Sequence, residues 1–125
     1  MKLRFWNLLP GIIILLAAVL LSARDLQKGG EIPEDVQAIL SASCYACHTT
    51  DAGSKDALKA VDFKKWDDYG SVKKIAILNN IREVVEAGKM PPGKYLSRYP
   101  DKALSSRDQE TIVEWSKQEA ARAME

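Results

Sequence analysis

Residues 44–48 read Cys-Tyr-Ala-Cys-His and contain all the cysteine and histidine of the chain. Two cysteines separated by two residues, with a histidine directly after the second, form the attachment signature for covalent haem. On one turn of helix, residues three apart share a face, so both thiols can reach the two vinyl groups at one porphyrin edge. His48 then lies under the iron and can provide an axial imidazole ligand. The motif predicts haem attachment at Cys44 and Cys47.

Other uses of the same motif agree less well with the rest of the sequence. A structural zinc site needs four protein ligands, whereas the chain holds two cysteines and one histidine in total. A thioredoxin-like dithiol belongs beside alternating strands and helices, and the sequence has no strand pattern. A structural disulfide would leave the adjacent histidine without a role. Covalent haem attachment is the preferred interpretation, and dithiol redox chemistry is the main alternative.

A methionine precedes two prolines in residues 88–93, which read Gly-Lys-Met-Pro-Pro-Gly. A thioether is a usual partner of histidine on the iron of cytochromes c, and consecutive prolines restrict the backbone that carries it. A second histidine ligand from this chain is impossible, and the other methionines are Met1 and Met124. Met90 is therefore the predicted second axial ligand. An open iron site, a lysine ligand and an ordinary packing role for Met90 are the alternatives.

The N-terminal segment indicates export. Residues 5–23 are almost wholly apolar and follow Lys2 and Arg4, with no acidic residue before Asp25. The run is close to the roughly 20 residues that span a bilayer, and the pattern also fits a removed signal peptide. Because a positive flank stays in the cytoplasm, the rest is expected on the periplasmic side, anchored to the inner membrane or released. The expected division is 1–23 signal peptide or membrane anchor, 24–32 linker and 33–125 c-type haem domain.

The exported part carries little net charge. Of 18 basic residues, Lys2 and Arg4 fall in the N-terminal segment, which leaves 16 against 17 acidic residues and a net charge of −1. This balance gives no indication of nucleic-acid binding. The expected partners are redox proteins, including a respiratory complex of the membrane, and the protein is expected to be a monomer.

The remaining chain is expected to be all-α. Pro33 suits the first position of a helix, and Val36 and Leu40 then share one face, so the first helix is predicted over 33–46. Residues 49–60 are rich in Thr, Asp, Gly, Ser and Lys, which is typical of a loop. The other predicted helices are a short one with an N-cap at Asp62, a long one over 72–87 and a terminal one over 106–122.

Single residues predict the ends and faces of the two long helices. Ser71 is a candidate N-cap and Gly88 a candidate C-cap of the helix over 72–87. Ser105 and Asp108 resemble a capping box at the start of the terminal helix. Asn80 is expected on the polar side of the helix over 72–87. The expected apolar stripe of that helix is Val72, Ile75, Leu78, Ile81 and Val85.

Together these features resemble class I cytochromes c, in which the attachment motif closes an early helix and a methionine loop comes later. More closely, the chain resembles a single-haem bacterial family known as the haem-binding domain. The resemblance implies one covalent haem c in a helical domain, with His48 and Met90 as axial ligands and Cys44 and Cys47 as thioether anchors. It also implies a periplasmic or membrane-tethered setting. The matching segments are 44–48, 61–66, 86–91 and 103–115.

One departure from the family concerns the region after the attachment motif. Similar proteins often carry a longer stretch rich in Trp and Pro, whereas thirteen residues separate His48 from Asp62 and none is proline. A carbonyl normally accepts the second ring N–H of a ligating histidine and fixes its orientation. The sequence does not indicate which residue provides this carbonyl.

A haem ligated by His and Met implies electron transfer. With both axial positions filled by protein, the iron has no vacant site for a substrate, so an electron carrier and not an enzyme is expected. The alternative is a haem-based sensor or a weak peroxidase-like enzyme in which Met90 is displaceable. The chain offers no second histidine for such chemistry, and no acid–base pair for cleaving peroxide is recognisable.

Overall fold

The computed structural model describes residues 31–52 and 54–125, and every regular element in these ranges is helical. The all-α class is therefore confirmed for the described part of the chain. The α-helices are α2 (Glu34–Ser43), α3 (Lys55–Ala60), α4 (Ser71–Glu86), α5 (Gly93–Leu96) and α6 (Ser106–Arg122). Short 3₁₀ helices are η2 (Thr50–Ala52), η3 (Phe63–Asp68) and η4 (Pro100–Lys102).

The predicted signal peptide or anchor, residues 1–23, lies outside the described residues, as does nearly all of the predicted linker. Within the described ranges, no helix combines the length and the apolar character needed to cross a membrane. The division of the chain near residues 23 and 32 stays a prediction.

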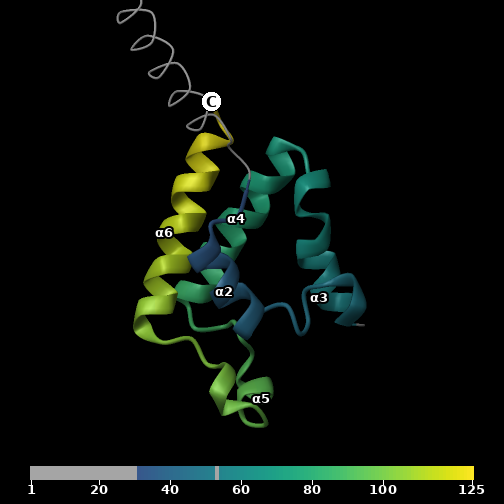
Figure 1. Ribbon diagram of the computed structural model, residues 1–125, viewed down its shortest axis with the longest axis vertical. Helices are drawn as coiled ribbons and strands as arrows, with labels where there is room; N and C mark the ends of the chain where they lie inside the picture. The colour runs from purple at the N-terminus through teal and green to yellow at the C-terminus, as the bar shows by residue number, and fades with distance from the viewer. Residues whose placement is uncertain (1–30, 53) are drawn as a thin grey trace, which may run out of the picture.

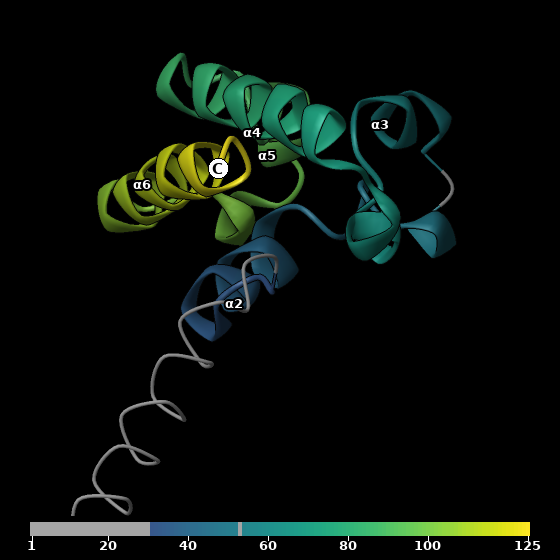
Figure 2. The same cartoon turned by 90° about the horizontal axis from the view of Figure 1, so that it is seen from above.

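Two long helices form the frame of the domain. α4 and α6 lie side by side and make the most extensive contact between helices, and α2 packs on α6 (Figure 1, Figure 2). The segment with α3 lies at the far end of the domain from α6 in both views.

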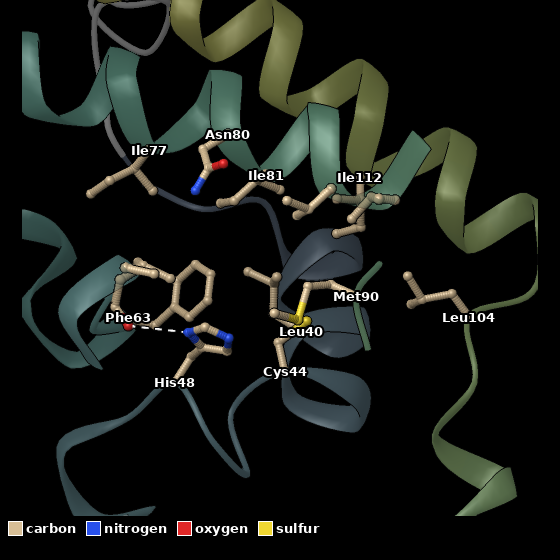
Figure 3. Close-up of a pocket in the computed structure, with 14 residues that line it drawn as sticks. Leu40, Cys44, His48, Phe63, Ile77, Asn80, Ile81, Met90, Leu104 and Ile112 are labelled. Atoms are coloured by element: carbon tan, nitrogen blue, oxygen red, sulfur yellow. Dashed lines mark hydrogen bonds between the residues drawn. The ribbon is translucent and has the colours of Figure 1, made fainter. Parts of the chain in front are cut away.

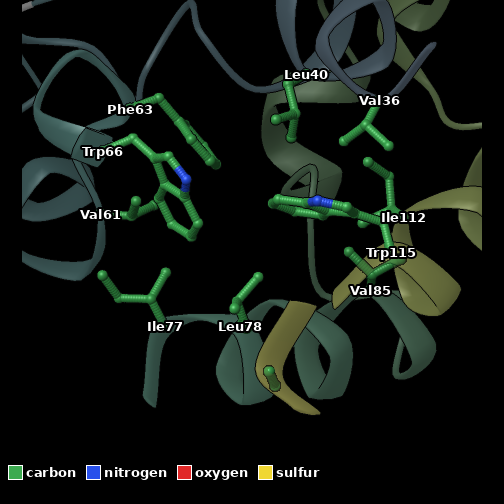
Figure 4. Close-up of a cluster of buried hydrophobic side chains, with 11 residues drawn as sticks. Val36, Leu40, Val61, Phe63, Trp66, Ile77, Leu78, Val85, Ile112 and Trp115 are labelled. Carbon is green, nitrogen blue, oxygen red and sulfur yellow. The ribbon is translucent and has the colours of Figure 1, made fainter. Parts of the chain in front are cut away.

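The core lies where α2, η3, α4 and α6 meet. Leu40 of α2, Leu78 of α4 and Ile112 of α6 are each no more than 1% exposed. Trp66 of η3 packs against Trp115 of α6 with the ring centroids 5.8 Å apart (Figure 4). Burying a large apolar side chain stabilises a fold by about 1.5–3 kcal/mol, so this cluster holds α2 and η3 against the α4–α6 pair.

The terminal helix begins and ends where the sequence predicts. The Ser105 hydroxyl oxygen accepts from the Asp108 N–H at 3.1 Å, and the Asp108 carboxylate accepts from the Ser105 N–H at 3.1 Å. This capping box satisfies two backbone donors at the helix start. The predicted range 106–122 is confirmed by α6.

Two predicted boundaries are wrong. The first helix ends at Ser43 and not at residue 46, because the attachment motif leaves the helix as a separate turn. Residues 49–60 were predicted as a loop, yet they contain η2 and α3. α3 reads Lys-Asp-Ala-Leu-Lys-Ala, in which all but Asp are good helix formers. The polar and glycine-containing residues before α3 concealed this short helix in the sequence.

The predicted faces of α4 also need correction. Val72 is 84% exposed, whereas Ile77, which the predicted stripe omits, is 7% exposed. Ser71 is the first residue of α4, and the N-cap is Gly70, which provides no side-chain cap. Asn80 is exposed, as expected for the polar side, and it also lines the open cavity described below. The physical reason is that α4 faces α6 on one side and this cavity on another, which a single apolar stripe does not describe.

Candidate functional site

The attachment motif forms a helical turn directly after α2. The N–H of Cys44 donates to the Leu40 carbonyl at 2.8 Å, which continues the hydrogen bonding of the helix for one more step. The N–H groups of Cys47 and His48 both donate to the Cys44 carbonyl, at 3.1 and 3.0 Å. This turn brings the two cysteines and the histidine to the wall of the same cavity.

All four predicted site residues line one open cavity. An outer lobe is bounded by Cys44, Cys47, His48, α3 and a segment that contributes Met90, Pro91, Pro92 and Tyr95. An inner lobe shares Cys44, His48, Ala60 and Met90 with the outer lobe. The two lobes adjoin at these residues and are together called the cavity below. The apolar wall of the inner lobe includes Leu40, Phe63, Ile77, Ile81, Val84 and Ile112 (Figure 3).

The His48 ring is oriented by the backbone of the next segment. Its Nδ1 lies 3.3 Å from the carbonyl oxygen of Val61. A carbonyl only accepts hydrogen bonds, so in the neutral ring Nδ1 carries the proton and Nε2 keeps its lone pair. The His48 carbonyl in turn accepts from the N–H of Phe63 at 2.9 Å. Val61 thus provides the carbonyl that the sequence did not identify, and Nε2 is available as a metal ligand.

Asp62 fixes the segment that holds His48. Its carboxylate accepts from the Thr50 hydroxyl and from the Lys64 N–H, and the side chain is almost fully buried. The Asp62 N–H donates to the Tyr69 hydroxyl at 3.0 Å. The hydrogen bond from Thr50 is the main reason that the pKa of Asp62 lies below its ordinary value of 3.8, with smaller contributions from Lys64 and Lys65. As predicted, Asp62 is the N-cap of η3.

The Cys44 thiol does not have the lowered pKa of a redox-active cysteine. Burial, together with the nearby Cys47, raises the pKa of Cys44 to about 11. Redox-active cysteines in a C-x-x-C motif instead have lowered pKa values, because the thiolate is the nucleophile. Both cysteines are free thiols in the structure. The raised pKa of Cys44 disfavours its thiolate, the form that thiol–disulfide exchange requires.

Met90 reaches the cavity through a sharp turn at the end of α4. Gly88 has a φ of +64°, a left-handed conformation that glycine adopts without steric cost. The N–H groups of Lys89 and Met90 then donate to the Val84 carbonyl at 2.8 and 3.3 Å. The C-cap of α4 is Ala87 and not Gly88 as predicted, and Gly88 follows it directly. The left-handed turn at Gly88 leads the chain to Met90, which lines both lobes.

The donor set and lining of the cavity fit a haem. Two thiols, one imidazole with a free Nε2 and one thioether converge on a space with mostly apolar walls, and these are the groups that hold haem in cytochromes c. In the close-up, His48 and Met90 lie on different sides of the cavity and Cys44 lies between them (Figure 3). Among the described residues, no cluster of three or more His, Cys, Asp or Glu side chains could hold a bare metal ion.

Fold and site together define a small helical domain built around a mostly apolar cavity. The model of the Haem-binding domain family matches residues 50–118, more than half of the chain. The chain belongs to this family. The matched region contains Met90 and begins after His48, so it is independent of the attachment motif. No match was found among curated proteins or among solved structures.

Two residues of the site were missed by reasoning from the sequence. Val61 contributes its carbonyl, and any residue type could do so, which leaves no signal in the sequence. Asn80 lines the inner lobe from α4. In the sequence, Asn80 is a polar residue beside Ile81 and close to Ile77. That pattern does not distinguish a residue that lines the cavity from one that only faces solvent.

Proposed function

We propose that this protein is a single-haem c-type cytochrome that carries electrons outside the cytoplasm. The observation that carries the proposal is that Cys44, Cys47, His48 and Met90 line one cavity. The family match adds support from a different part of the chain, because it contains Met90 but none of residues 44–48.

Each residue has a distinct role in this proposal. The sulfurs of Cys44 and Cys47 would hold the porphyrin through thioether bonds, and His48 Nε2 and Met90 Sδ would ligate the iron. Haem iron supplies a one-electron couple between the ferric and ferrous states when it is bound. The Val61 carbonyl holds the Nδ1 proton of His48 and so keeps the ring in one orientation. The apolar wall of the inner lobe excludes water, which favours a raised reduction potential.

The proposed setting follows from the N-terminal segment. An apolar run over 5–23 with Lys2 and Arg4 before it supports export to the periplasmic side, with the run either retained as an anchor or cleaved. Exchange of electrons then takes place with other redox proteins, including a membrane respiratory complex. The protein acts as a monomeric carrier and not as an enzyme.

A second function is favoured by one feature of Met90. The side chain is 37% exposed, and an accessible thioether could be displaced from the iron by a small molecule. The protein would then be a haem-based sensor or a weak peroxidase-like enzyme.

The test is to produce the full chain in a host that attaches haem to exported proteins. A mass increase of one haem per chain, a ferric charge-transfer band from Met–iron ligation and no carbon monoxide binding to the reduced protein are expected. Met90→Ala should remove that band, open the iron to carbon monoxide and lower the reduction potential. Met124→Ala is the matched control, because Met124 is 69% exposed and lies outside the cavity lining.

Three results would decide against the proposal. Colourless protein without added mass would contradict haem attachment. Ready carbon monoxide binding by the unmodified protein would favour the sensor or peroxidase function. An unchanged spectrum in Met90→Ala would exclude Met90 as a ligand.

A further inference from the structure

Asn80 contributes a polar side chain to an otherwise apolar wall of the inner lobe. His48 and Asn80 are the residues with polar side-chain nitrogen or oxygen among the 14 that line it. The Asn80 side chain forms no hydrogen bond or ion pair with another described residue. An amide that loses water without gaining a partner costs about 1–3 kcal/mol in proteins. Asn80 is exposed in this structure, and a group that fills the cavity would displace water from its amide, so a polar partner on that group would offset the loss.

The position of Asn80 narrows the choice of partner. In the close-up, Asn80 projects into the cavity from α4, on the side away from Cys44 (Figure 3). Haem carries its two vinyl groups and its two propionates at opposite edges of the ring. A ring held through its vinyl edge near Cys44 therefore directs its propionate edge toward the part of the cavity where Asn80 lies.

The hydrogen-bonding chemistry of a propionate also supports it as the partner of Asn80. A carboxylate is a strong, charge-assisted acceptor for an amide N–H, whereas a thioether sulfur is a weak one. Asn80 remains accessible although it lines the cavity, so a carboxylate can reach it. We propose that the Asn80 amide donates a hydrogen bond to a haem propionate and thereby positions the propionate edge of the cofactor. This inference rests on the proposed function and deepens it.

The hydrogen bond has a defined electrostatic consequence. A donor to the propionate withdraws negative charge from the haem and favours the ferrous form, which carries one positive charge less at the iron. Hydrogen bonds to charged groups are worth about 1.5–3 kcal/mol, of which only the difference between the two oxidation states affects the potential. Loss of the donor should shift the ferric–ferrous equilibrium a few-fold toward the ferric form.

The experiment compares haem-loaded variants of the full chain. Asn80→Leu keeps a similar shape without a donor, and Asn80→Asp places an anion next to the propionate. Asn79→Leu is the matched control, since Asn79 is exposed and does not line the cavity. The readouts are the reduction potential and the propionate bending band in resonance Raman spectra. Both Asn80 variants should lower the potential and shift the band, with Asn80→Asp giving the larger change, and Asn79→Leu should resemble the unmodified protein.

Two outcomes would overturn the assignment. If Asn80→Leu matches Asn79→Leu in both readouts, Asn80 does not contact the propionate. If Asn80→Leu changes the Met–iron band but not the propionate band, the amide donates to Met90. Should Asn80→Asp fail to acquire haem, Asn80→Ser replaces it, and its shorter side chain should also shift the band. Failure of the proposed function is distinguishable, because the unmodified protein would then lack covalent haem or the Met–iron band.

Discussion

His48 is held from two sides by the short segment of residues 61–63. The Val61 carbonyl accepts from the ring, and the Phe63 N–H donates to the His48 carbonyl. The Phe63 ring also lies near the imidazole, with the centroids 6.3 Å apart. Asp62 sits between these two contacts and anchors the segment to Thr50 and Tyr69. The orientation of His48 therefore depends on a buried carboxylate that does not itself contact the cavity.

Replacing Asp62 tests how much its carboxylate stabilises the fold at different pH values. Its lowered pKa means that the unfolded chain binds the proton at a higher pH than the folded chain does. The carboxylate therefore stabilises the fold above the unfolded pKa of about 4, and the contribution is lost as pH falls through the lower folded pKa. Asp62→Asn should be less stable than the unmodified protein at pH 7, and the difference should shrink below about pH 4.

The measurement is urea unfolding at several pH values. Asp101→Asn is the control, because the Asp101 side chain is 70% exposed and its ion pair with Lys102 lies at the surface. Such pairs contribute about 0–1 kcal/mol, so this variant should follow the unmodified protein. A stability difference for Asp62→Asn that stays constant with pH would show that the charge of Asp62 has no role.

For the helices, the sequence predicted those features that depend only on residues close together in the chain. The bounds of α6 could be predicted because the Ser105–Asp108 capping box acts within four residues. Gly88 was identifiable for the same reason. The exposure of Val72 and the place of Asn80 in the cavity lining were not predictable, since they depend on where α6 packs against α4 and where the cavity lies. The residue types and order along the chain predicted the convergence of Cys44, Cys47, His48 and Met90, but not the carbonyl of Val61.

Gly88 connects the end of α4 to the position of Met90. Gly88→Ala forces a side chain into a left-handed conformation at about 1–2 kcal/mol, although an added methyl would meet no atom within 4 Å. We expect the variant to lose about that much stability in chemical unfolding. The Met–iron band of the haem-loaded protein should also weaken, because Lys89 and Met90 bond to Val84 directly after this turn.

Gly93 provides the comparison for this prediction. It begins α5, has no positive φ and has equally open space around it. Gly93→Ala should therefore be neutral or stabilising by about 0.4–1 kcal/mol, because it restricts the unfolded chain without strain. Equal losses for the two variants would show that the conformation of Gly88 is not what matters.

Across the described residues, the packed core and the cavity share a wall. Leu40 and Ile112 belong to both, since each is buried in the core and also lines the inner lobe. The core of the described residues is small, with Trp66 and Trp115 as its largest members. A chain of this size buries a limited fraction of its surface. A cofactor that fills the cavity would therefore complete the core as well as provide the redox centre.

This dual role predicts a large effect of haem on stability. The double variant Cys44→Ala, Cys47→Ala cannot form thioether bonds and should lose its colour on acid–acetone extraction. Loss of the covalent cofactor should lower the melting temperature by about 10 °C or more, since each kcal/mol corresponds to about 4–8 °C in a domain of this size. Circular dichroism should retain part of the helical signal, because α4 and α6 contact each other directly. Unmodified protein made without haem attachment should melt like the double variant, and if it instead melts like the haem-loaded protein, the cavity does not depend on the cofactor for its stability.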